Sequence, residues 1–222
     1  MRRNRALLAS FPLSTSAPSV PVTPLSFAHL AEIVAVMSDA FYDYPVMRYV
    51  LGPREPYDDR LCRLVELFVS NRAYRNDPMI GVHDETGALV GAATMTLPRP
   101  SDPPAALHVV REMLWGELGA DARARYDEFT TATQRFAIAA PHYHLNMIGV
   151  RRSHHGRGLA RALLEAVHER SRADGASSGV SLTTERAANV TLYEHFGYRV
   201  VGQARVGGAF ETWTLFRENE PR

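Results

Sequence analysis

The residues that decide the fold are VRRSHHGRGLARALL, at positions 150–164, where an apolar strand runs into a glycine-rich turn and then a helix. Residues 143–150 are extended and apolar, and leucine and valine recur every four residues from position 159, a spacing typical of a helix. Helix N-termini carry unpaired N–H groups and a partial positive charge. Gly156 and Gly158 would let a phosphate approach that terminus. We therefore predict a strand, an anion-binding loop and a helix.

The sequence lacks the motifs of two other kinds of phosphate-binding loop. It contains neither a Gly-x-x-x-x-Gly-Lys-Ser/Thr loop nor a Gly-x-Gly-x-x-Gly loop with a following ribose-binding acid. This argues against ATP and dinucleotide binding. A glycine pair can also serve only to relieve crowding where a strand turns into a helix, so a second motif is needed.

That second motif is NVTLYEHFGY, at residues 189–198. Together the two segments resemble the acyl-CoA signature of the GCN5-related N-acetyltransferases (GNAT). In that family a Gln/Arg-x-x-Gly-x-Gly/Ala turn opens a helix, and an Asn-x-x-x-Tyr-x-x-x-Gly-Phe/Tyr segment follows. The resemblance covers about 141–217. The segment AFYDYPVMRYVL, residues 40–51, is more weakly similar to the subgroup that contains puromycin N-acetyltransferase.

The resemblance implies an α/β acetyltransferase fold, with a central mixed, mostly antiparallel sheet flanked by helices. We interpret residues 1–19 as a flexible leader and 20–218 as a single acyltransferase domain, in which 98–141 form a helical insertion before the cofactor-binding strand. In addition to the helix after the loop, sequence patterns predict helices over 26–40, 57–74, 105–117, 122–139 and 188–196. They predict strands near 20–22 and over 79–83, 88–97, 143–150, 179–184, 199–205 and 210–217.

Composition narrows the range of partners. The formal net charge of +1 gives no broad attraction to nucleic acid or to an acidic membrane. No apolar run approaches the roughly 20 residues that cross a bilayer. Cys62 is the only cysteine, and we predict that it is a buried helix residue in a reducing compartment. We therefore expect a cytoplasmic protein that has no nucleic-acid or membrane partner.

The resemblance also implies acetyl-CoA as the cofactor. The strand backbone from Met147 to Val150 would hold the pantetheine arm and the acetyl carbonyl, and the N–H groups of 156–161 would bind the diphosphate. The residues predicted to bind acetyl-CoA are Met147, Ile148, Val150, His155, Gly156, Arg157, Gly158, Leu159, Ala160, Arg161, Asn189 and Tyr193.

Tyr193 matches the general acid of the family, and Asn189 lies one helical turn before it on the same face. The general base is less defined, because Asn146 stands where many relatives have a glutamate. We rank His144 first, since it shares the strand face of Asn146 and histidine titrates near neutral pH. The alternatives are Glu185, Glu112 and a water relay.

For the acceptor, the sequence suggests an aromatic, mildly acidic pocket suited to an amine. Its predicted substrate-binding residues are Tyr42, Asp43, Tyr44 and Trp115, assisted by Phe41 and Tyr126. The insertion favours a closed pocket, and hence a primary amine of a small molecule. The alternatives are a protein or peptide amine, or a CoA-binding sensor without catalysis.

Two further expectations concern assembly and metals. GNAT proteins often pair through their C-terminal strands, so the resemblance is compatible with a homodimer. His142, His144, His154 and His155 lie close together in the sequence, which raises the question of zinc. The cofactor loop already explains these positions, and we expect no metal.

His155 occupies a position where the family usually has Gln or Arg, and histidine changes its charge near neutral pH. We therefore expect CoA to bind more tightly to the wild type at about pH 6 than at about pH 8, and His155→Gln to reduce this difference. CoA titration of both proteins tests the expectation. An identical pH dependence would contradict it.

Overall fold

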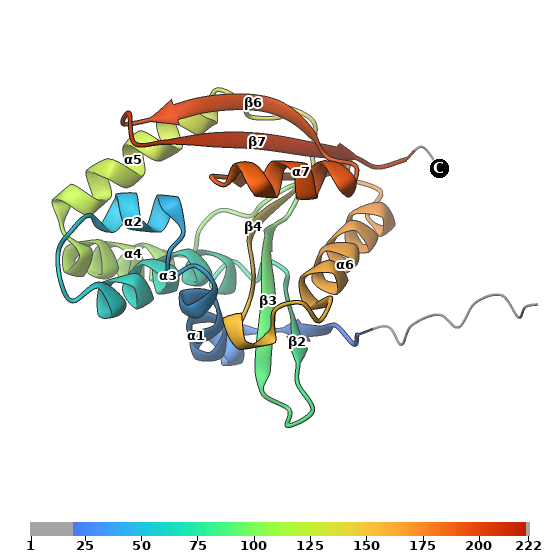
Figure 1. Ribbon diagram of the computed structural model, residues 1–222, viewed down its shortest axis with the longest axis horizontal. Coiled ribbons are helices and arrows are strands. Elements are labelled where there is room, and N and C mark those ends of the chain that lie inside the picture. The colour runs from blue at the N-terminus through green and yellow to red at the C-terminus, as the bar shows by residue number, and fades with distance from the viewer. Residues whose placement is uncertain (1–19, 221–222) are drawn as a thin grey trace, which may run out of the picture.

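The computed structural model describes residues 20–220, which form one seven-stranded sheet with helices on both faces (Figure 1). The predicted leader, 1–19, lies outside these residues. The helices are η1 (Phe27–His29), α1 (Leu30–Ala40), α2 (Pro45–Leu51), α3 (Tyr57–Ala73), α4 (Ala105–Leu118), α5 (Ala120–Gln134), η2 (Arg152–His154), α6 (Leu159–Ala173) and α7 (Ala187–His195). The strands are β1 (Thr23–Leu25), β2 (Met79–His83), β3 (Leu89–Thr96), β4 (Tyr143–Val150), β5 (Gly179–Thr184), β6 (Arg199–Val206) and β7 (Phe210–Glu218).

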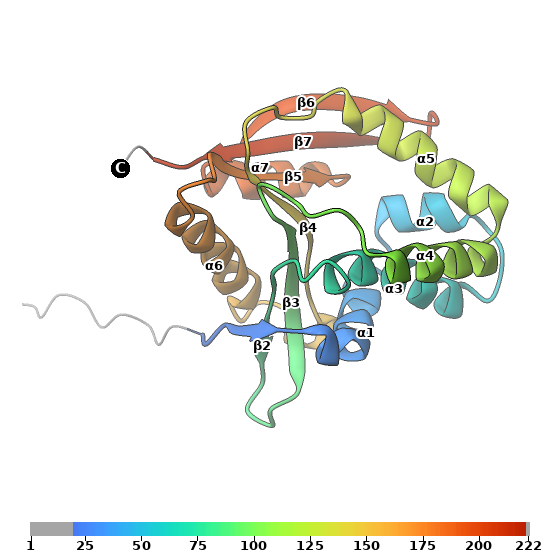
Figure 2. The ribbon, with the colours of Figure 1, turned by 180° about the vertical axis from the view of Figure 1, so that it is seen from behind.

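The strands follow the order β1-β2-β3-β4-β5-β7-β6. Only β4 and β5 run parallel, while every other neighbouring pair is antiparallel. Helix α6 lies on one side of β3 and β4, and α1, α3 and α4 lie on the other (Figures 1 and 2). This arrangement confirms the mixed, mostly antiparallel sheet flanked by helices that the sequence predicted.

Strands β4 and β5 pair over only three residues. Tyr143–Leu145 faces Val180–Leu182, and beyond that point no residue of β4 pairs with β5. On the opposite edge of β4 the register to β3 shifts, so that Asn146 is an extra residue between two paired positions. Such a bulge bends a strand and increases its twist. The edge of β4 from Asn146 onward therefore faces an opening instead of a neighbouring strand.

Two hydrophobic cores hold the sheet between its helices. One core joins α1, α2, α3 and α4 through side chains such as Ile33, Met37 and Leu64, which are fully buried. The other joins α6 to the opposite face of the sheet through Leu163 and Val167. Burial of each such side chain contributes about 1.5–3 kcal/mol, so both helical layers are fixed to the strands that flank the opening.

The structure corrects several predicted boundaries. None of the predicted helices includes α2, which begins at Pro45. Proline is well suited to the first helical position, where its missing N–H leaves no bond unmade, and Tyr44 before it is extended. Helix α5 ends at Gln134 rather than at residue 139.

Three other expectations need comment. The first strand lies at Thr23–Leu25, just after residues 20–22, near which the sequence predicted it. Cys62 is on a helix as predicted but is exposed rather than buried. Within residues 20–220, no helix is both long enough and apolar enough to cross a membrane.

A close approach of α1 to β4 requires a glycine at position 149. A Cβ atom there would lie 2.7 Å from Ala40 Cβ and 3.1 Å from Met37 Sδ, whereas a Cβ at Gly175 would meet nothing within 4 Å. We expect Gly149→Ala to lower the free energy of unfolding by about 1–2 kcal/mol, because tightly packed cores tolerate overpacking poorly. Gly175→Ala, the matched control, should be neutral or slightly stabilising. Chemical denaturation compares the two, and equal stabilities would contradict the packing argument.

Candidate active site

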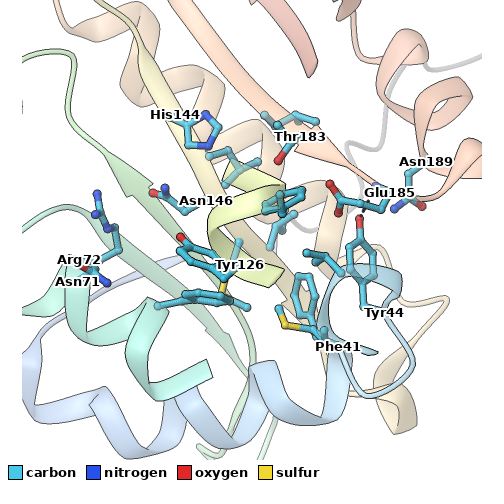
Figure 3. A pocket seen from close by; sticks show the side chains of 18 of the residues that line it. Phe41, Tyr44, Asn71, Arg72, Tyr126, His144, Asn146, Thr183, Glu185 and Asn189 are labelled. Carbon is cyan, nitrogen blue, oxygen red and sulfur yellow. Dashed lines mark hydrogen bonds between the residues drawn. The ribbon is translucent and has the colours of Figure 1, made fainter. Parts of the chain in front are cut away.

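A cavity of about 300 Å³ lies beside the point where β4 and β5 separate (Figure 3). Its wall is built from the start of α2, the end of α3, both helices of the predicted insertion, and the diverging strands. Several predicted site residues line it, namely Tyr44, His144, Met147, Ile148, Asn189 and Tyr193. The remaining lining residues are Phe41, Val46, Met47, Phe68, Asn71, Arg72, Arg111, Tyr126, Phe129, Leu145, Asn146, Leu182, Thr183 and Glu185.

Glu185 immediately follows β5 and is only 8% exposed. Its Oε1 accepts a hydrogen bond of 2.8 Å from the Thr212 hydroxyl, and its backbone N–H donates to the Tyr44 hydroxyl at 3.2 Å. Burial raises the pKa of the Glu185 carboxyl to about 7, although its hydrogen bonds from Thr212 and Tyr44 oppose the shift. Glu185 can therefore gain or lose a proton near neutral pH.

Tyr193 lies on α7 close to this carboxyl. Burial, reinforced by the negative charge of Glu185, raises the pKa of the Tyr193 hydroxyl to about 12. The hydroxyl is therefore protonated at neutral pH and can serve as a proton donor. One turn earlier on the same helix, the Asn189 side-chain amide donates to Thr184 Oγ1 at 3.1 Å, which ties α7 to the end of β5.

His144 lines the cavity in a different electrostatic setting. Burial, together with the charges of His142 and Arg72, lowers the pKa of the His144 imidazole to about 4. Its Nδ1 lies 2.8 Å from the Ser181 hydroxyl. A base with so low a pKa holds protons weakly at neutral pH, so these surroundings favour Glu185 over His144 as the proton acceptor.

Glu112, the other carboxylate considered from the sequence, lies outside the cavity lining. Its side chain is 65% exposed and forms an ion pair of 2.9 Å with Arg123. This surface position separates it from Tyr193 and from the diverging strands.

The glycine loop has the geometry that the sequence predicted for an anion site. Gly156 and Gly158 have φ values of 77° and 76°, which favour glycine, and Gly158 is the N-cap of α6. A Cβ atom at either position would meet nothing within 4 Å, so the space in front of the helix terminus is open. The loop and the unpaired edge of β4 together fit an acyl-CoA, with a diphosphate at the helix and an extended arm along the strand.

His155 is oriented toward the strand. Its Nε2 lies 3.0 Å from the Val150 carbonyl oxygen, a contact in which the ring nitrogen donates. This bond fastens the loop to the end of β4 and leaves Nδ1 as the only ring atom for a phosphate. Two arginines near the loop have different surroundings. Arg157 is exposed, whereas Arg161 forms an ion pair of 2.8 Å with Glu165.

Three of the four predicted acceptor residues do not line the cavity. Trp115 is 5% exposed and belongs to the helical core. Asp43 forms an ion pair of 2.6 Å with Arg48, whose guanidinium stacks over Tyr57 at 3.6 Å. Tyr42 packs against the same Tyr57 ring. Of these four residues only Tyr44 lines the cavity, where it is joined by the two assisting aromatic residues, Phe41 and Tyr126.

The sequence reasoning missed Arg72 and Arg111, which line the cavity from α3 and α4. Each lies within an amphipathic helical pattern, where an arginine is usually a solvated surface residue. Only the packing of α3 against α4, a tertiary contact, brings both toward the cavity.

The four histidines near the loop have different neighbours. His142 Nδ1 lies 2.7 Å from the Ala140 carbonyl, and His154 Nε2 lies 3.7 Å from an Asp84 carboxylate oxygen. Among residues 20–220, no group of three or more His, Cys, Asp or Glu side chains is arranged to hold a metal ion.

The raised pKa of Glu185 links stability to pH. Between its ordinary value of 4.5 and about 7, the folded protein keeps a proton that the unfolded chain has lost, so rising pH destabilises the fold. This contribution amounts to about 3 kcal/mol across the window. We expect Glu185→Gln to become more stable relative to the wild type on going from about pH 5 to about pH 8. Denaturant unfolding at both pH values measures this, with Glu112→Gln as control, and a pH-independent difference would contradict it.

Comparison with known proteins independently supports the resemblance to acetyltransferases. Residues 113–200, which include the glycine loop and Tyr193, match the model of the acetyltransferase (GNAT) domain. No curated protein sequence matches the chain. The histone acetyltransferase HPA2 and related acetyltransferase from Corynebacterium glutamicum has a similar solved structure, with 22% identity over 91% of this chain and 98% of that chain, and a TM-score of 0.64.

Two insect enzymes share the fold. Arylalkylamine N-acetyltransferase 2 from Aedes aegypti is 14% identical over 88% of this chain and 96% of that chain, with a TM-score of 0.62. Polyamine N-acetyltransferase from Drosophila melanogaster is 18% identical over 88% of this chain and 97% of that chain, with a TM-score of 0.55. The domain match over residues 113–200 and the fold shared with these solved acetyltransferases together support a GCN5-related, acetyl-CoA-dependent N-acetyltransferase.

Proposed function

We propose that this protein transfers an acetyl group from acetyl-CoA to a primary amine of a small molecule by direct attack. The observation that carries the proposal is the pairing of Glu185 and Tyr193 at one cavity wall, where burial gives the two groups opposite proton-transfer roles. Both groups lie where β5 has separated from β4, next to the strand edge that has no partner.

The residues that would hold acetyl-CoA belong to β4 and the loop that follows it. The backbone edge from Met147 to Val150 would bind the pantetheine arm, and the N–H groups of 156–161 would bind the diphosphate. The open space at Gly156 and Gly158 supports this assignment. When bound, acetyl-CoA supplies the acetyl group as a thioester.

The chain's own residues account for the proton transfers. Glu185, in its ionised form, accepts a proton from the ammonium or from the attacking nitrogen, either directly or through a water molecule. As the C–N bond forms and the C–S bond breaks, the Tyr193 hydroxyl donates its proton to the departing sulfur. Because the pKa of Glu185 is about 7 and that of Tyr193 about 12, each starts in the required state just above neutral pH.

The shape of the cavity favours a small acceptor. Its volume of about 300 Å³ matches the lower end of small-molecule sites. The insertion covers one side of it through Arg111, Tyr126 and Phe129. Two of the similar structures are named for acetylation of arylalkylamines or polyamines, which agrees with a small amine.

A protein or peptide amine is the second candidate, and the name of the Corynebacterium structure as a histone acetyltransferase favours it. That reading requires a groove in which an extended chain can lie. A catalytically weak CoA-binding sensor is a third candidate, because Asn146 replaces the strand glutamate of many relatives.

Thiol release from acetyl-CoA, measured against a panel of small amines and peptides, tests the proposal. We expect turnover with a small amine, and a loss of about a hundredfold to ten-thousandfold in kcat for Tyr193→Phe and Glu185→Gln. Glu185→Gln should also remove the rise of kcat/KM through about pH 7. Gly158→Glu should abolish acetyl-CoA binding, because it puts a negative side chain with strained φ at the diphosphate site.

Glu112→Gln is the matched control, since the same change at an exposed carboxylate should leave kcat unaltered. Turnover only with peptides would favour the protein acceptor, and acetyl-CoA binding without turnover would favour the sensor. A full kcat in both Tyr193→Phe and Glu185→Gln would overturn the catalytic assignment.

A further inference from the structure

The cavity has two chemically different sides. Figure 3 shows Glu185, Asn189 and Tyr44 together on one side, and Arg72 with Asn71 on the opposite side, with Tyr126 between them. The proposed chemistry uses only the Glu185 side. The guanidinium side contributes to no step of the proposed acetyl transfer, and it lines the space in which a second group of the acceptor would lie.

Arg72 is held rigidly at the end of α3. Its side chain is 13% exposed and forms an ion pair of 2.8 Å with Asp77, which is fully buried. The same Nη1 donates to the Thr96 hydroxyl on β3. Burial lowers the pKa of Arg72, the charge of Asp77 opposes this shift, and the charges of Arg75 and Arg111 add to it. Since an arginine in a protein stays protonated, this region carries concentrated positive charge.

Positive charge exceeds negative charge around Arg72. Asp77 is one carboxylate, while Arg72 interacts electrostatically with two further guanidinium groups, those of Arg75 and Arg111. Arg111 lines the cavity, and among residues 20–220 it has neither an ion pair nor a hydrogen bond to its guanidinium. Its sequence neighbour Glu112 is already paired with Arg123 outside the cavity. The guanidinium of Arg111 is therefore available to a ligand.

The side-chain amide of Asn146 is a further hydrogen-bond donor on the Arg72 side of the cavity. The Thr96 hydroxyl donates to Asn146 Oδ1 at 3.0 Å, so the acceptor atom of that side chain is occupied. Its N–H groups have no partner within the described part of the chain, and Asn146 lines the cavity. A relay from Asp77 through Arg72 and Thr96 thus orients Asn146 as a donor. Guanidinium and amide N–H groups together form a site for oxyanions.

We propose that the acceptor is a small amine that also carries an anionic group, a carboxylate or a phosphate, separated from the amine by an apolar spacer. The anion would lie against Arg111, Arg72 and the Asn146 amide, and the amine would face Glu185. The aromatic rings of Tyr126 and Phe41 line the space between. A second cationic group at the Arg111 end would be repelled, so simple diamines would be poor acceptors.

This inference rests on the proposed function. A pair of matched amines distinguishes a failure of the inference from a failure of the proposed function. The enzyme is assayed with para-(aminomethyl)benzoate and with its neutral isostere para-(aminomethyl)benzamide. We expect the benzoate to show at least about a tenfold higher kcat/KM in the wild type, because a hydrogen-bonded charge is worth that much discrimination. Aminopropyl phosphate against propylamine provides the same comparison for a phosphate.

Arg111→Gln should lower kcat/KM for the preferred anionic amine about tenfold to a hundredfold and leave the neutral amine nearly unchanged. Arg111→Lys should retain part of the preference, since lysine keeps the charge but loses the planar fork. Arg123→Gln, on the neighbouring helix and outside the cavity, is the matched control and should change neither amine.

Thermal unfolding without CoA provides a readout independent of catalysis. The benzoate should raise the Tm of the wild type more than the benzamide does, and Arg111→Gln should remove the difference. Equal kcat/KM values for charged and neutral members of both pairs, or an equal loss for both in Arg111→Gln, would overturn this inference while leaving the acetyltransferase proposal intact. Failure of every amine to react would overturn the proposed function first.

Discussion

The early end of pairing between β4 and β5 is the constraint on which the rest of the site depends. The two strands share only three paired positions, and the bulge at Asn146 turns β4 away as it continues. Backbone groups that would have bonded within the sheet are left for a ligand, and unmet backbone donors and acceptors are costly when buried. The same divergence creates the space into which Glu185, Tyr193 and the α2 segment project. A fully paired sheet would have neither the strand edge nor the cavity.

Burial then sorts the titratable groups of the cavity into different roles. The pKa of the Glu185 carboxyl rises to about 7 and that of the Tyr193 hydroxyl to about 12, while the pKa of the His144 imidazole falls to about 4. In each case the dominant cause is removal from water, which disfavours the charged form. In the proposed function, the raised pKa that makes Glu185 a proton acceptor near neutral pH also lowers the stability of the fold as the pH rises.

Local patterns predicted most of the fold, because strands and helices with one buried face carry a clear periodicity and the glycine loop carries its own backbone requirement. Tyr193 and the loop could be located by motif. Arg72 and Arg111 could not, since they reach the cavity only through the tertiary packing of α3 against α4. Trp115 shows the converse, because an aromatic residue on a predicted wall helix proved to be a core residue. The position of a residue in the sequence says little about whether its side of a helix will face a cavity.

The helices α4 and α5 connect β3 to β4, two adjacent antiparallel strands that a short turn could join equally well. The register of the sheet, the glycine loop and the Glu185–Tyr193 pair therefore do not depend on how long this connection is. Three residues of the cavity wall, Arg111, Tyr126 and Phe129, come from it. In the proposed function, these three residues of the acceptor wall are thus separate in the sequence from the glycine loop and from Glu185 and Tyr193, while Arg72 and Asn146 on the same side of the cavity lie outside the connection. Exchange of the segment that contains α4 and α5 would therefore change these three wall residues and leave the loop and the Glu185–Tyr193 pair in place.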